Sequence, residues 1–350
     1  MKLTENVNIK DLQPLISPKE LKDQYPLSDE LAQNTVLPAR KTIQSILCGR
    51  DKRMLAIVGP CSIHDHEAAL DYAQRLQRLQ EVVKENICLV MRTYFEKPRT
   101  TLGWKGLLYD PLLDGSDDIS EGVRLSREIL LEITRLGVPT AMEILDPIVP
   151  QYLSDLVAWV SIGARTASSQ IHRQMASGLS MPIGFKNSTS GNPNIAVEAI
   201  KAASSPHAFL GIAEDGRAAV ATTHGNHYGH VVLRGGLTGP NYEREYVVFT
   251  EVLLEKAGIH NGIIIDCSHA NSHKDYRRQR EVWDNVLKQI TGGSKSISGM
   301  MLESYIQPGS QKVKLPVEEM EYGQSITDAC IGWDETEELI RSASSALEGR

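Results

Sequence analysis

The chain has 350 residues, of which 41% are hydrophobic and 23% are charged, and its formal net charge is −7. This length allows two average domains or one large domain such as an α/β barrel. The acidic balance argues against a nucleic-acid partner. The lack of an apolar run near ~18 residues, or of a signal-peptide pattern, argues against a membrane partner or secretion. The five cysteines are widely spaced, which fits a reduced, cytoplasmic protein without a disulfide framework.

Residues 1–30 are polar, carry several prolines and have no strong hydrophobic period. We expect them to form an extension that lies on another surface, such as a neighbouring subunit, because a free tail of this kind would be disordered. A helix is predicted over 28–47, with Ser28 as its N-cap and Gly49 just past its end. Residues 1–50 are therefore expected to be an oligomer or regulatory unit, and residues 51–350 the catalytic unit.

Apolar runs alternate with amphipathic helical patterns through the rest of the chain. Eight runs have the length and turn boundaries of buried strands, at 54–58, 87–91, 140–144, 157–162, 182–185, 230–233, 262–266 and 297–302. Helical patterns follow most of them, at 68–83, 123–136, 151–158, 170–176, 195–203, 246–257, 275–290 and 336–347. This alternation predicts the α/β fold class, as a (β/α)8 TIM barrel. Two further runs, 209–212 and 218–223, predict a small β-hairpin inserted before strand 6, at about 207–228.

The residues that end the eight predicted strands are all charged or able to bind a metal. In a (β/α)8 barrel these positions surround the active site. In chain order they are Cys61, Arg92 with Lys97, Glu143, Arg165, Lys186, Arg234, His269 and Glu303. Any one of them alone fits a surface residue or a satisfied polar group. The complete set predicts an active site.

Two kinds of chemistry are present in this set. The cations Arg92, Lys97, Arg165, Lys186 and Arg234 are enough to hold more than one phosphate or carboxylate. The possible metal ligands are a thiol, an imidazole and carboxylates, with the fourth from the loop before the last helix: Cys61, His269, Glu303 and Asp328. This mixture favours Mn, Fe, Co or Zn over Mg or Ca. A Schiff-base aldolase stays open, because neighbouring cations would lower the pKa of Lys186.

The histidines outside this set can be explained by structural roles as well as by active-site roles. His172 lies in a helical stretch and is either an active-site residue or a helix-face residue. His224, His227 and His230 lie in T-H-G-N-H-Y-G-H, where a polar turn into the sixth strand is favoured over a metal site.

Seven long motifs occur together along the chain. They are G-P-C-S-I-H-D (59–65), F-E-K-P-R-T-T-L-G-W-K-G (95–106), I-G-A-R-T (162–166), G-F-K-N (184–187), L-R-G-G (233–236), D-C-S-H-A-N (266–271) and Y-G-Q-S-I-T-D-A-C-I-G-W (322–333). With them the chain resembles the type I 3-deoxy-D-arabino-heptulosonate 7-phosphate (DAHP) synthases from about residue 10 to 348. The resemblance implies a metal-dependent, aldol-like condensation of phosphoenolpyruvate with erythrose 4-phosphate. That reaction begins the shikimate pathway to chorismate and the aromatic amino acids.

The resemblance also implies roles for individual residues. The metal ligands would be Cys61, His269, Glu303 and Asp328. The phosphoenolpyruvate site would be Arg92, Lys97, Glu143, Ala164, Arg165, Lys186 and Arg234, and the erythrose 4-phosphate grip Lys97, Pro98, Arg99 and Thr100. The catalytic residues would be Lys97, Glu143, Lys186, Cys61 and His269. This pattern argues against the Schiff-base alternative.

The N-terminal extension and the hairpin resemble those of feedback-inhibited members, so a homo-oligomer, dimer or tetramer, is expected. The effector pocket would involve Pro150, Gln151, Met175, Leu179, Ser180, Phe209 and Gly211, with an N-terminal segment from a neighbouring subunit. The motifs at 145–153, 178–182 and 271–279 are most similar to tyrosine-sensitive isoenzymes. Gly211 agrees, because phenylalanine-sensitive members carry serine there and glycine leaves room for a phenol hydroxyl. Phenylalanine and tryptophan stay open as effectors.

Two other functions compete with this interpretation. The related octulosonate 8-phosphate synthases use a five-carbon sugar phosphate, but K-P-R-T (97–100) argues against them. An inactive amino-acid-binding regulator on the same scaffold is the second, and the intact metal set argues against it. The chain departs from the family pattern at Leu237, where lysine is frequent, and at Ser188 and Ser190, which replace glycine and aspartate.

Overall fold

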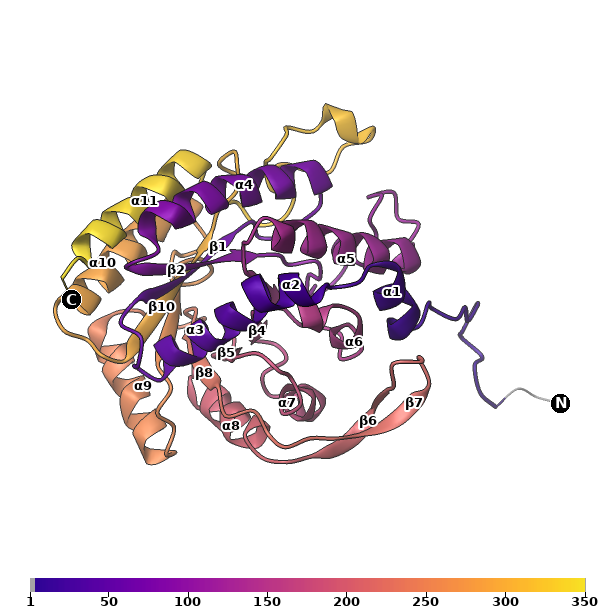
Figure 1. Cartoon of the computed structure of the whole chain (residues 1–350), viewed down its shortest axis with the longest axis horizontal. Coiled ribbons are helices and arrows are strands. Elements are labelled where there is room, and N and C mark those ends of the chain that lie inside the picture. The colour runs from indigo at the N-terminus through magenta and orange to yellow at the C-terminus, as the bar shows by residue number, and fades with distance from the viewer. Residues whose placement is uncertain (1–3, 350) are drawn as a thin grey trace.

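Eight parallel strands close into a barrel in the computed structural model, which describes residues 4–349 (Figure 1). The strands are β1 (Met54–Gly59), β2 (Ile87–Arg92), β3 (Thr140–Glu143), β4 (Trp159–Ile162), β5 (Ile183–Lys186), β8 (Gly229–Leu233), β9 (Ile263–Asp266) and β10 (Ile297–Glu303). Their order around the barrel is β1–β10–β9–β8–β5–β4–β3–β2. The predicted (β/α)8 barrel is therefore confirmed.

Helices surround the barrel (Figure 1). They are α4 (His66–Val83), α5 (Ile119–Arg135), α6 (Pro150–Leu153), α7 (Gln170–Ala176), α8 (Asn194–Ala203), α9 (Arg244–Lys256), α10 (Gln279–Thr291) and α11 (Trp333–Ala346). The helix expected over 151–158 is wrong in extent. α6 is a single turn followed by a 3₁₀ turn (Ser154–Leu156), because the chain must be extended by Trp159 to pair with Ala141 of β3.

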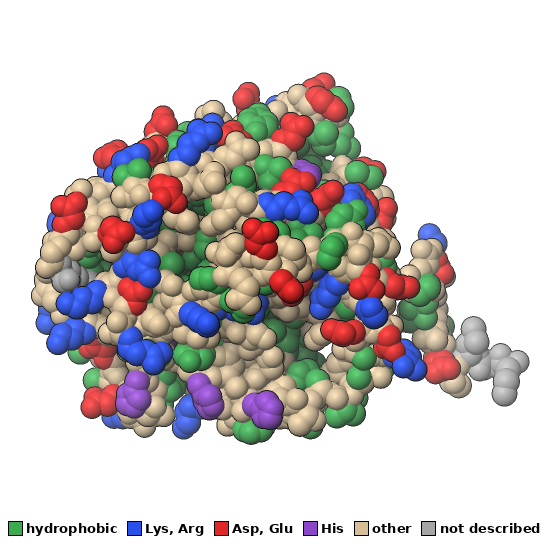
Figure 2. Space-filling view, viewed as in Figure 1, with side chains coloured by type: hydrophobic (Ala, Val, Ile, Leu, Met, Phe, Trp, Pro, Cys, Tyr) green, Lys and Arg blue, Asp and Glu red, His purple; other side chains and the backbone are tan. Residues whose placement is uncertain are grey.

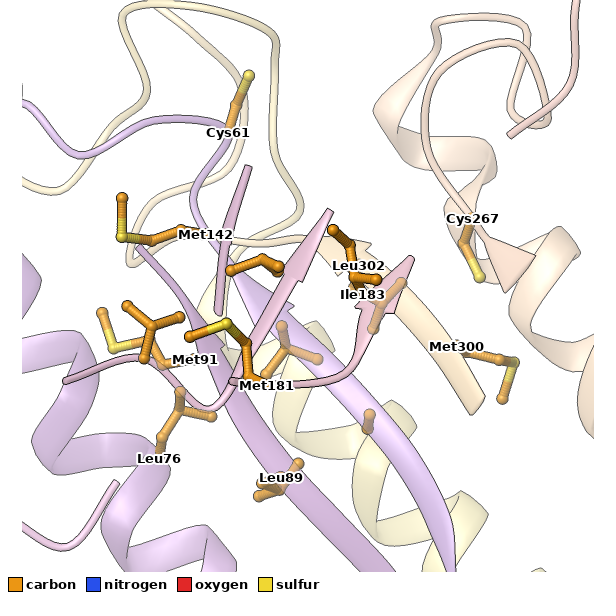
Figure 3. Close-up of a cluster of buried hydrophobic side chains, with 14 of the residues drawn as sticks. Cys61, Leu76, Leu89, Met91, Met142, Met181, Ile183, Cys267, Met300 and Leu302 are labelled. Atoms are coloured by element: carbon orange, nitrogen blue, oxygen red, sulfur yellow. The ribbon is translucent and has the colours of Figure 1, made fainter. Parts of the chain in front are cut away.

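The strand side chains divide into two apolar layers, because successive residues of a strand point to opposite faces. The inner layer fills the barrel and includes Leu55, Ile57, Val90, Val232, Ile264 and Met301. The outer layer packs the strands against the helices; Figure 3 shows part of it, including Met91, Met142, Ile183 and Met300. In that view Cys61 lies at one end of the drawn group, with its thiol directed away from the others.

The N-terminal end of the barrel is closed by α3 (Leu37–Leu47). Ile43 and Leu47 are buried against the inner layer, and the carbonyl of Leu47 accepts from Gly262 N–H at 2.8 Å. The helical path starts at α2 (Asp29–Leu31) with Ser28 as N-cap, as predicted, and passes through a π segment (Ala32–Val36). The π segment precedes Pro38, which has no N–H to donate and whose ring crowds the preceding turn.

A helix that the sequence analysis did not predict, α1 (Pro18–Gln24), lies within the N-terminal extension. Its start is a capping box, in which Ser17 and Glu20 bond to each other's backbone N–H groups. The Lys19 N–H donates to Glu214 O at 2.8 Å, and Tyr152 of α6 donates to Ile16 O at 2.8 Å. In this chain the extension therefore contacts α6 and the hairpin of the same chain.

The predicted hairpin is confirmed. β6 (Ala208–Ile212) and β7 (Ala218–Thr222) pair antiparallel, with Leu210 opposite Val220, and form a separate two-stranded sheet along the lower edge of Figure 1. The division into units at 1–50 and 51–350 stays a prediction, and residues 1–3 and 350 of it lie outside the described residues.

The surface carries mixed charge. Figure 2 shows acidic and basic side chains interspersed over the face in view, without a large basic area. No helix within residues 4–349 is both long and apolar enough to cross a membrane.

Candidate active site

A cavity of about 480 Å³ lies at the C-terminal ends of the strands. All the residues predicted for the metal and substrate sites line it except Cys61; they are Arg92, Lys97, Pro98, Arg99, Thr100, Glu143, Ala164, Arg165, Lys186, Arg234, His269, Glu303 and Asp328. Cys61 is fully buried, and the Lys97 ammonium donates to its sulfur at 3.0 Å. The fold thus brings the whole predicted set into one site.

The loop after β2 presents Lys97, and the neighbouring carboxyl group of Glu96 holds that loop in place. Glu96 is buried and accepts hydrogen bonds from the N–H groups of Leu145 at 3.2 Å and Asp146 at 3.0 Å, just after β3. Burial raises the pKa of Glu96 to about 8. The sequence analysis missed Glu96, because the motif that contains it does not reveal which of its residues faces a neighbouring loop.

Lys186 and Glu143 form a buried ion pair, with 2.6 Å between Nζ and Oε2. Burial alone would lower the pKa of Lys186, but Glu143, Tyr94 and Asp266 raise it above the ordinary value. The expectation that neighbouring cations lower this pKa is wrong, since Glu143 is the nearer charge. A Schiff-base lysine needs a neutral amine, so this pair weighs against that chemistry.

The same contact acts on the carboxylate. Burial alone would raise the pKa of Glu143, but the Lys186 ammonium outweighs it and lowers the pKa to about 2. Glu143 is therefore ionised at neutral pH, as an oxygen acceptor at the floor of the cavity.

Arg92 at the end of β2 has an unsatisfied donor. Its guanidinium is 1% exposed and donates to Pro60 O at 3.3 Å and to Glu303 at 3.2 Å. Nη1 has no hydrogen-bond partner within the described part of the chain. Because a buried donor without a partner is costly, this N–H fits an anionic ligand oxygen in the cavity.

Arg99, Arg165 and Arg234 bond to neutral oxygen atoms. Arg165 donates to Thr100 Oγ1 at 3.1 Å, Arg99 to Trp104 O at 2.7 Å, and Arg234 to Gly235 O at 3.5 Å. None of the three guanidinium groups is neutralised by a carboxylate in an ion pair within residues 4–349. Their charge is therefore available for phosphate or carboxylate groups.

Three of the four predicted metal ligands form a cluster. One ligand atom each from Cys61, Glu303 and Asp328 lies within 4.8 Å of the other two. His269 is outside this cluster, with Nε2 3.8 Å from Glu303 Oε1. A thiolate, an imidazole and two carboxylates suit a divalent ion of the Mn, Fe, Co or Zn type.

The second ring nitrogen of His269, Nδ1, is fixed by Ser268 and Asp266. Nδ1 lies 2.7 Å from Ser268 Oγ and 3.0 Å from Asp266 Oδ2, a buried oxygen that also lies 4.0 Å from Lys186 Nζ. Donation from Nδ1 leaves the lone pair on Nε2, as a metal-binding histidine requires. Asp266 was not predicted, although it is the last residue of β9, because His269 was taken as the chemical residue of this strand end.

Cys61 would lose its proton on binding a metal. Burial and the nearby Glu303 raise the pKa of its thiol to about 11, although Lys97 acts in the opposite direction. A thiolate is the form that binds metal, so metal binding at this site has to release a proton.

Comparison with known proteins identifies the family. The model of the DAHP synthetase I family matches residues 28–341. The chain belongs to the DAHP synthetase I family. It is 50% identical over 345 residues to the Tyr-sensitive phospho-2-dehydro-3-deoxyheptonate aldolase of Escherichia coli (strain K12), covering 99% of this chain and 96% of that protein.

Two further relatives agree. The Phe-sensitive phospho-2-dehydro-3-deoxyheptonate aldolase of the same strain is 48% identical over 346 residues, covering 99% of this chain and 98% of that protein. The solved phospho-2-dehydro-3-deoxyheptonate aldolase of Francisella tularensis SCHU S4 superimposes with a TM-score of 0.95 at 44% identity, covering 97% and 99% of the two chains. The match to this DAHP synthetase I fold extends over nearly the whole chain.

The residues expected for an effector pocket lie on neighbouring elements of this DAHP synthetase I barrel. Pro150 and Gln151 belong to α6, Met175 to α7 with Leu179 and Ser180 just after it, and Phe209 and Gly211 to β6. Figure 1 shows α6, α7 and β6 on the same side of the barrel as α1, and α7 contacts β6. Their role as an effector site stays a prediction.

Two histidines left open by the sequence prove to be structural contacts. His172 links α7 to the turn after β3, because its Nε2 donates to Leu145 O at 2.7 Å. His230 is buried inside β8, where its Nε2 accepts from Trp159 at 3.0 Å and burial lowers its pKa to about 4. A neutral His230 is part of the barrel and not of a polar turn.

Proposed function

We propose that this chain is a 3-deoxy-7-phosphoheptulonate synthase. It condenses phosphoenolpyruvate with D-erythrose 4-phosphate, giving DAHP and phosphate, at the entry to the shikimate pathway. The observation that carries this proposal is one cavity in which unpaired guanidinium groups stand beside a Cys61–Glu303–Asp328 cluster. An anionic substrate and a Lewis acid are therefore available side by side.

The cations divide between the two substrates. Arg92, Lys186 and Arg234 line the cavity and suit the phosphate and carboxylate of phosphoenolpyruvate. Arg99 and Thr100 lie on the loop after β2 and suit the phosphate of erythrose 4-phosphate. Arg165 belongs to the phosphoenolpyruvate set and borders this loop through its bond to Thr100. The free charge of Arg99, Arg165 and Arg234 supports anion binding, and the division between the two substrates is the one that the family resemblance implies.

The reaction joins C3 of phosphoenolpyruvate to the aldehyde carbon. A divalent ion held by Cys61, His269, Glu303 and Asp328 would supply Lewis acidity to the aldehyde. The Lys97 ammonium, 3.0 Å from the Cys61 sulfur, can donate a hydrogen bond to the aldehyde oxygen as negative charge develops there.

Carbon–carbon bond formation leaves positive charge at C2 of the former phosphoenolpyruvate. Water then adds to C2, and the bond from C2 to the phosphate oxygen breaks. Glu143 is ionised and can accept the proton of this water, while Lys186 holds the departing phosphate.

The test is consumption of phosphoenolpyruvate with erythrose 4-phosphate, in metal-stripped and Mn-restored protein. Restored protein should consume phosphoenolpyruvate and release equal phosphate, and stripped protein should not. A parallel assay with arabinose 5-phosphate should give little turnover. Equal or faster turnover with that five-carbon sugar, or none with either sugar, would overturn the proposal.

We also infer that tyrosine is the feedback effector and that the chain forms a dimer or tetramer. Gly211 supports tyrosine, because the protein itself does not fill the space beside this residue. A Cβ at position 211 would lie 3.8 Å from Ala221 and 3.9 Å from the Phe209 ring, at ordinary contact distance, so the space is open to a phenol hydroxyl. Inhibition assays with tyrosine, phenylalanine and tryptophan test the first inference, and light scattering tests the second. Inhibition by another amino acid alone, or a monomer, would contradict them.

A further inference from the structure

Three buried asparagines connect the loops that follow β5, β8 and β9. Asn187, Asn241 and Asn271 are 0%, 4% and 1% exposed, and none of them lines the active-site cavity. Asn187 follows Lys186 directly, and Asn271 lies two residues after His269. Each loop in this group thus carries one residue of the proposed site, including Arg234 just after β8.

The hydrogen bonds of Asn187 cross from the β5 loop to the β8 loop. Its Oδ1 accepts from the N–H of Arg234 at 2.8 Å and from Asn241 Nδ2 at 3.2 Å. Its Nδ2 donates to the carbonyls of Gly235 at 2.9 Å and Ser188 at 2.8 Å. All four hydrogen-bonding positions of this side-chain amide are therefore used.

Asn241 and Asn271 extend the connection to the β9 loop. Asn241 Oδ1 accepts from Gly235 N–H at 2.7 Å, and its own N–H donates to Asn271 Oδ1 at 2.8 Å. Asn271 Nδ2 donates to the carbonyls of Leu233 at 3.1 Å and Asp266 at 2.8 Å. The backbone on both sides of Arg234 is therefore tied to the strand that precedes His269.

The close packing of the backbone leaves no room for larger side chains between these loops. A Cβ on Gly236 would meet Gly191 N at 2.1 Å, and one on Gly235, where φ is +72°, would meet the Ala270 carbonyl carbon at 2.7 Å. The loops touch backbone to backbone, so small amides at their margins carry the cross-links. Asparagine is required because each amide both donates and accepts, which neither aspartate nor leucine can do.

We propose that Asn187, Asn241 and Asn271 are positioning residues that fix Lys186 and Arg234 relative to each other, with β9 as the anchor. This inference rests on the proposed function, because it assigns the network to the phosphoenolpyruvate half of the site. The loop with Arg99 and Thr100 has no bond to the three asparagines. A change in the network should therefore affect one substrate and not the other.

The test is the Asn241→Ala variant of the full-length, Mn-loaded protein, since Asn241 is outside the cavity. Its KM for phosphoenolpyruvate should rise about tenfold, as expected for the loss of buried hydrogen bonds. Its KM for erythrose 4-phosphate should stay within about twofold. The matched control is Asn192→Ala, an exposed asparagine of the β5 loop that bonds only to Ser188 and Asn194; it should leave both values unchanged.

The outcomes separate the two proposals. An inactive wild-type protein overturns the proposed function, whereas an active wild type with equal changes in both KM values, or none, overturns the positioning role. If Asn241→Ala does not fold, Asn241→Asp decides in the same assay, because it keeps the volume and the oxygen that accepts from Gly235. A thermal unfolding curve for each variant separates a selective KM change from general loss of structure.

Discussion

The two ends of the barrel are built in opposite ways. At the N-terminal end, Ile43 and Leu47 of α3 pack against the apolar inner layer, and the backbone there is paired. At the C-terminal end, charged groups such as Arg92, Lys186 and Glu303 are buried within one cavity. Burying a charge is unfavourable unless a partner compensates it. The closed end therefore stabilises the fold, while the open end holds buried charges, which are unfavourable for folding, in position for a ligand.

The largest effect is expected from removing a metal ligand at the open end. In Cys61→Ala, bound Mn and turnover should both be lost. Each should fall by more than the roughly 10- to 100-fold seen when a residue that only supports a metal ligand is removed. The closed end should keep the barrel folded. Metal analysis, turnover and circular dichroism check this. Cys88→Ala is the control, since Cys88 lies on β2 away from the cavity; full activity of Cys61→Ala would refute the metal assignment.

The buried ion pair gives the next largest effect. In Glu143→Gln, Lys186 loses its nearest counter-charge and keeps only the more distant Asp266 at 4.0 Å, so the free energy of unfolding should fall by about 3 kcal/mol and turnover should fall as well. Chemical denaturation at pH 7 measures the first change. The control is Glu338→Gln on α11, which removes an exposed pair with Arg280 and should change little.

The same pair predicts a pH dependence. The pKa of Glu143 is about 2 in the folded chain and 4.5 in the unfolded chain. The contribution of Glu143 to stability is therefore fully present above about pH 4.5. That contribution is lost as the pH falls from 4.5 towards 2. The wild type should therefore lose stability more steeply over this range than Glu143→Gln, and equal slopes would contradict the low pKa.

The sequence was sufficient for those site residues that directly follow apolar runs. Lys186 and Glu303 close their strands, so a strand assignment alone places them at the open end. Glu96 was missed for a physical reason, because its importance comes from burial against the loop after β3, about 50 residues away. The same holds for Asn241, whose bonds depend on how two glycine-containing loops meet. Asp266 closes β9 and could have been predicted by the same rule as Lys186 and Glu303, but His269, three residues later, was taken to represent this strand end.

Local geometry explains the differences in the fold. The amphipathic pattern predicted one helix over 28–47, but Pro38 forces a π segment that a hydrophobic period cannot reveal. The pattern at 151–158 was helical, yet strand pairing at Trp159 ended it early. The capping box at Ser17 was visible in the sequence, but the helix it starts is too short to show a period.

A change at the closed end should have the opposite signature to one at the open end. Ile43→Ala removes a fully buried side chain of α3 and should lower the free energy of unfolding by about 2–5 kcal/mol. Both KM values should stay unchanged at a temperature where the variant is folded. Lys41→Ala, an exposed position of the same helix, is the control. A large KM change in Ile43→Ala would show that the two ends are not independent.

The smallest effect is expected from a substitution in β6, on the side of the barrel that is proposed to bind the effector. Gly211→Ser adds a side chain at ordinary contact distance from Ala221 and Phe209, so folding and uninhibited turnover should be unchanged. The added hydroxymethyl group would take the space proposed for the phenol hydroxyl. Inhibition by tyrosine should weaken about tenfold, the loss that goes with one unfavourable polar contact, while inhibition by phenylalanine should strengthen. Dose–response curves with both amino acids measure this, with Ala219→Ser on the opposite strand as the control. Unchanged selectivity would remove Gly211 from the effector site and leave the activity of the open end untouched.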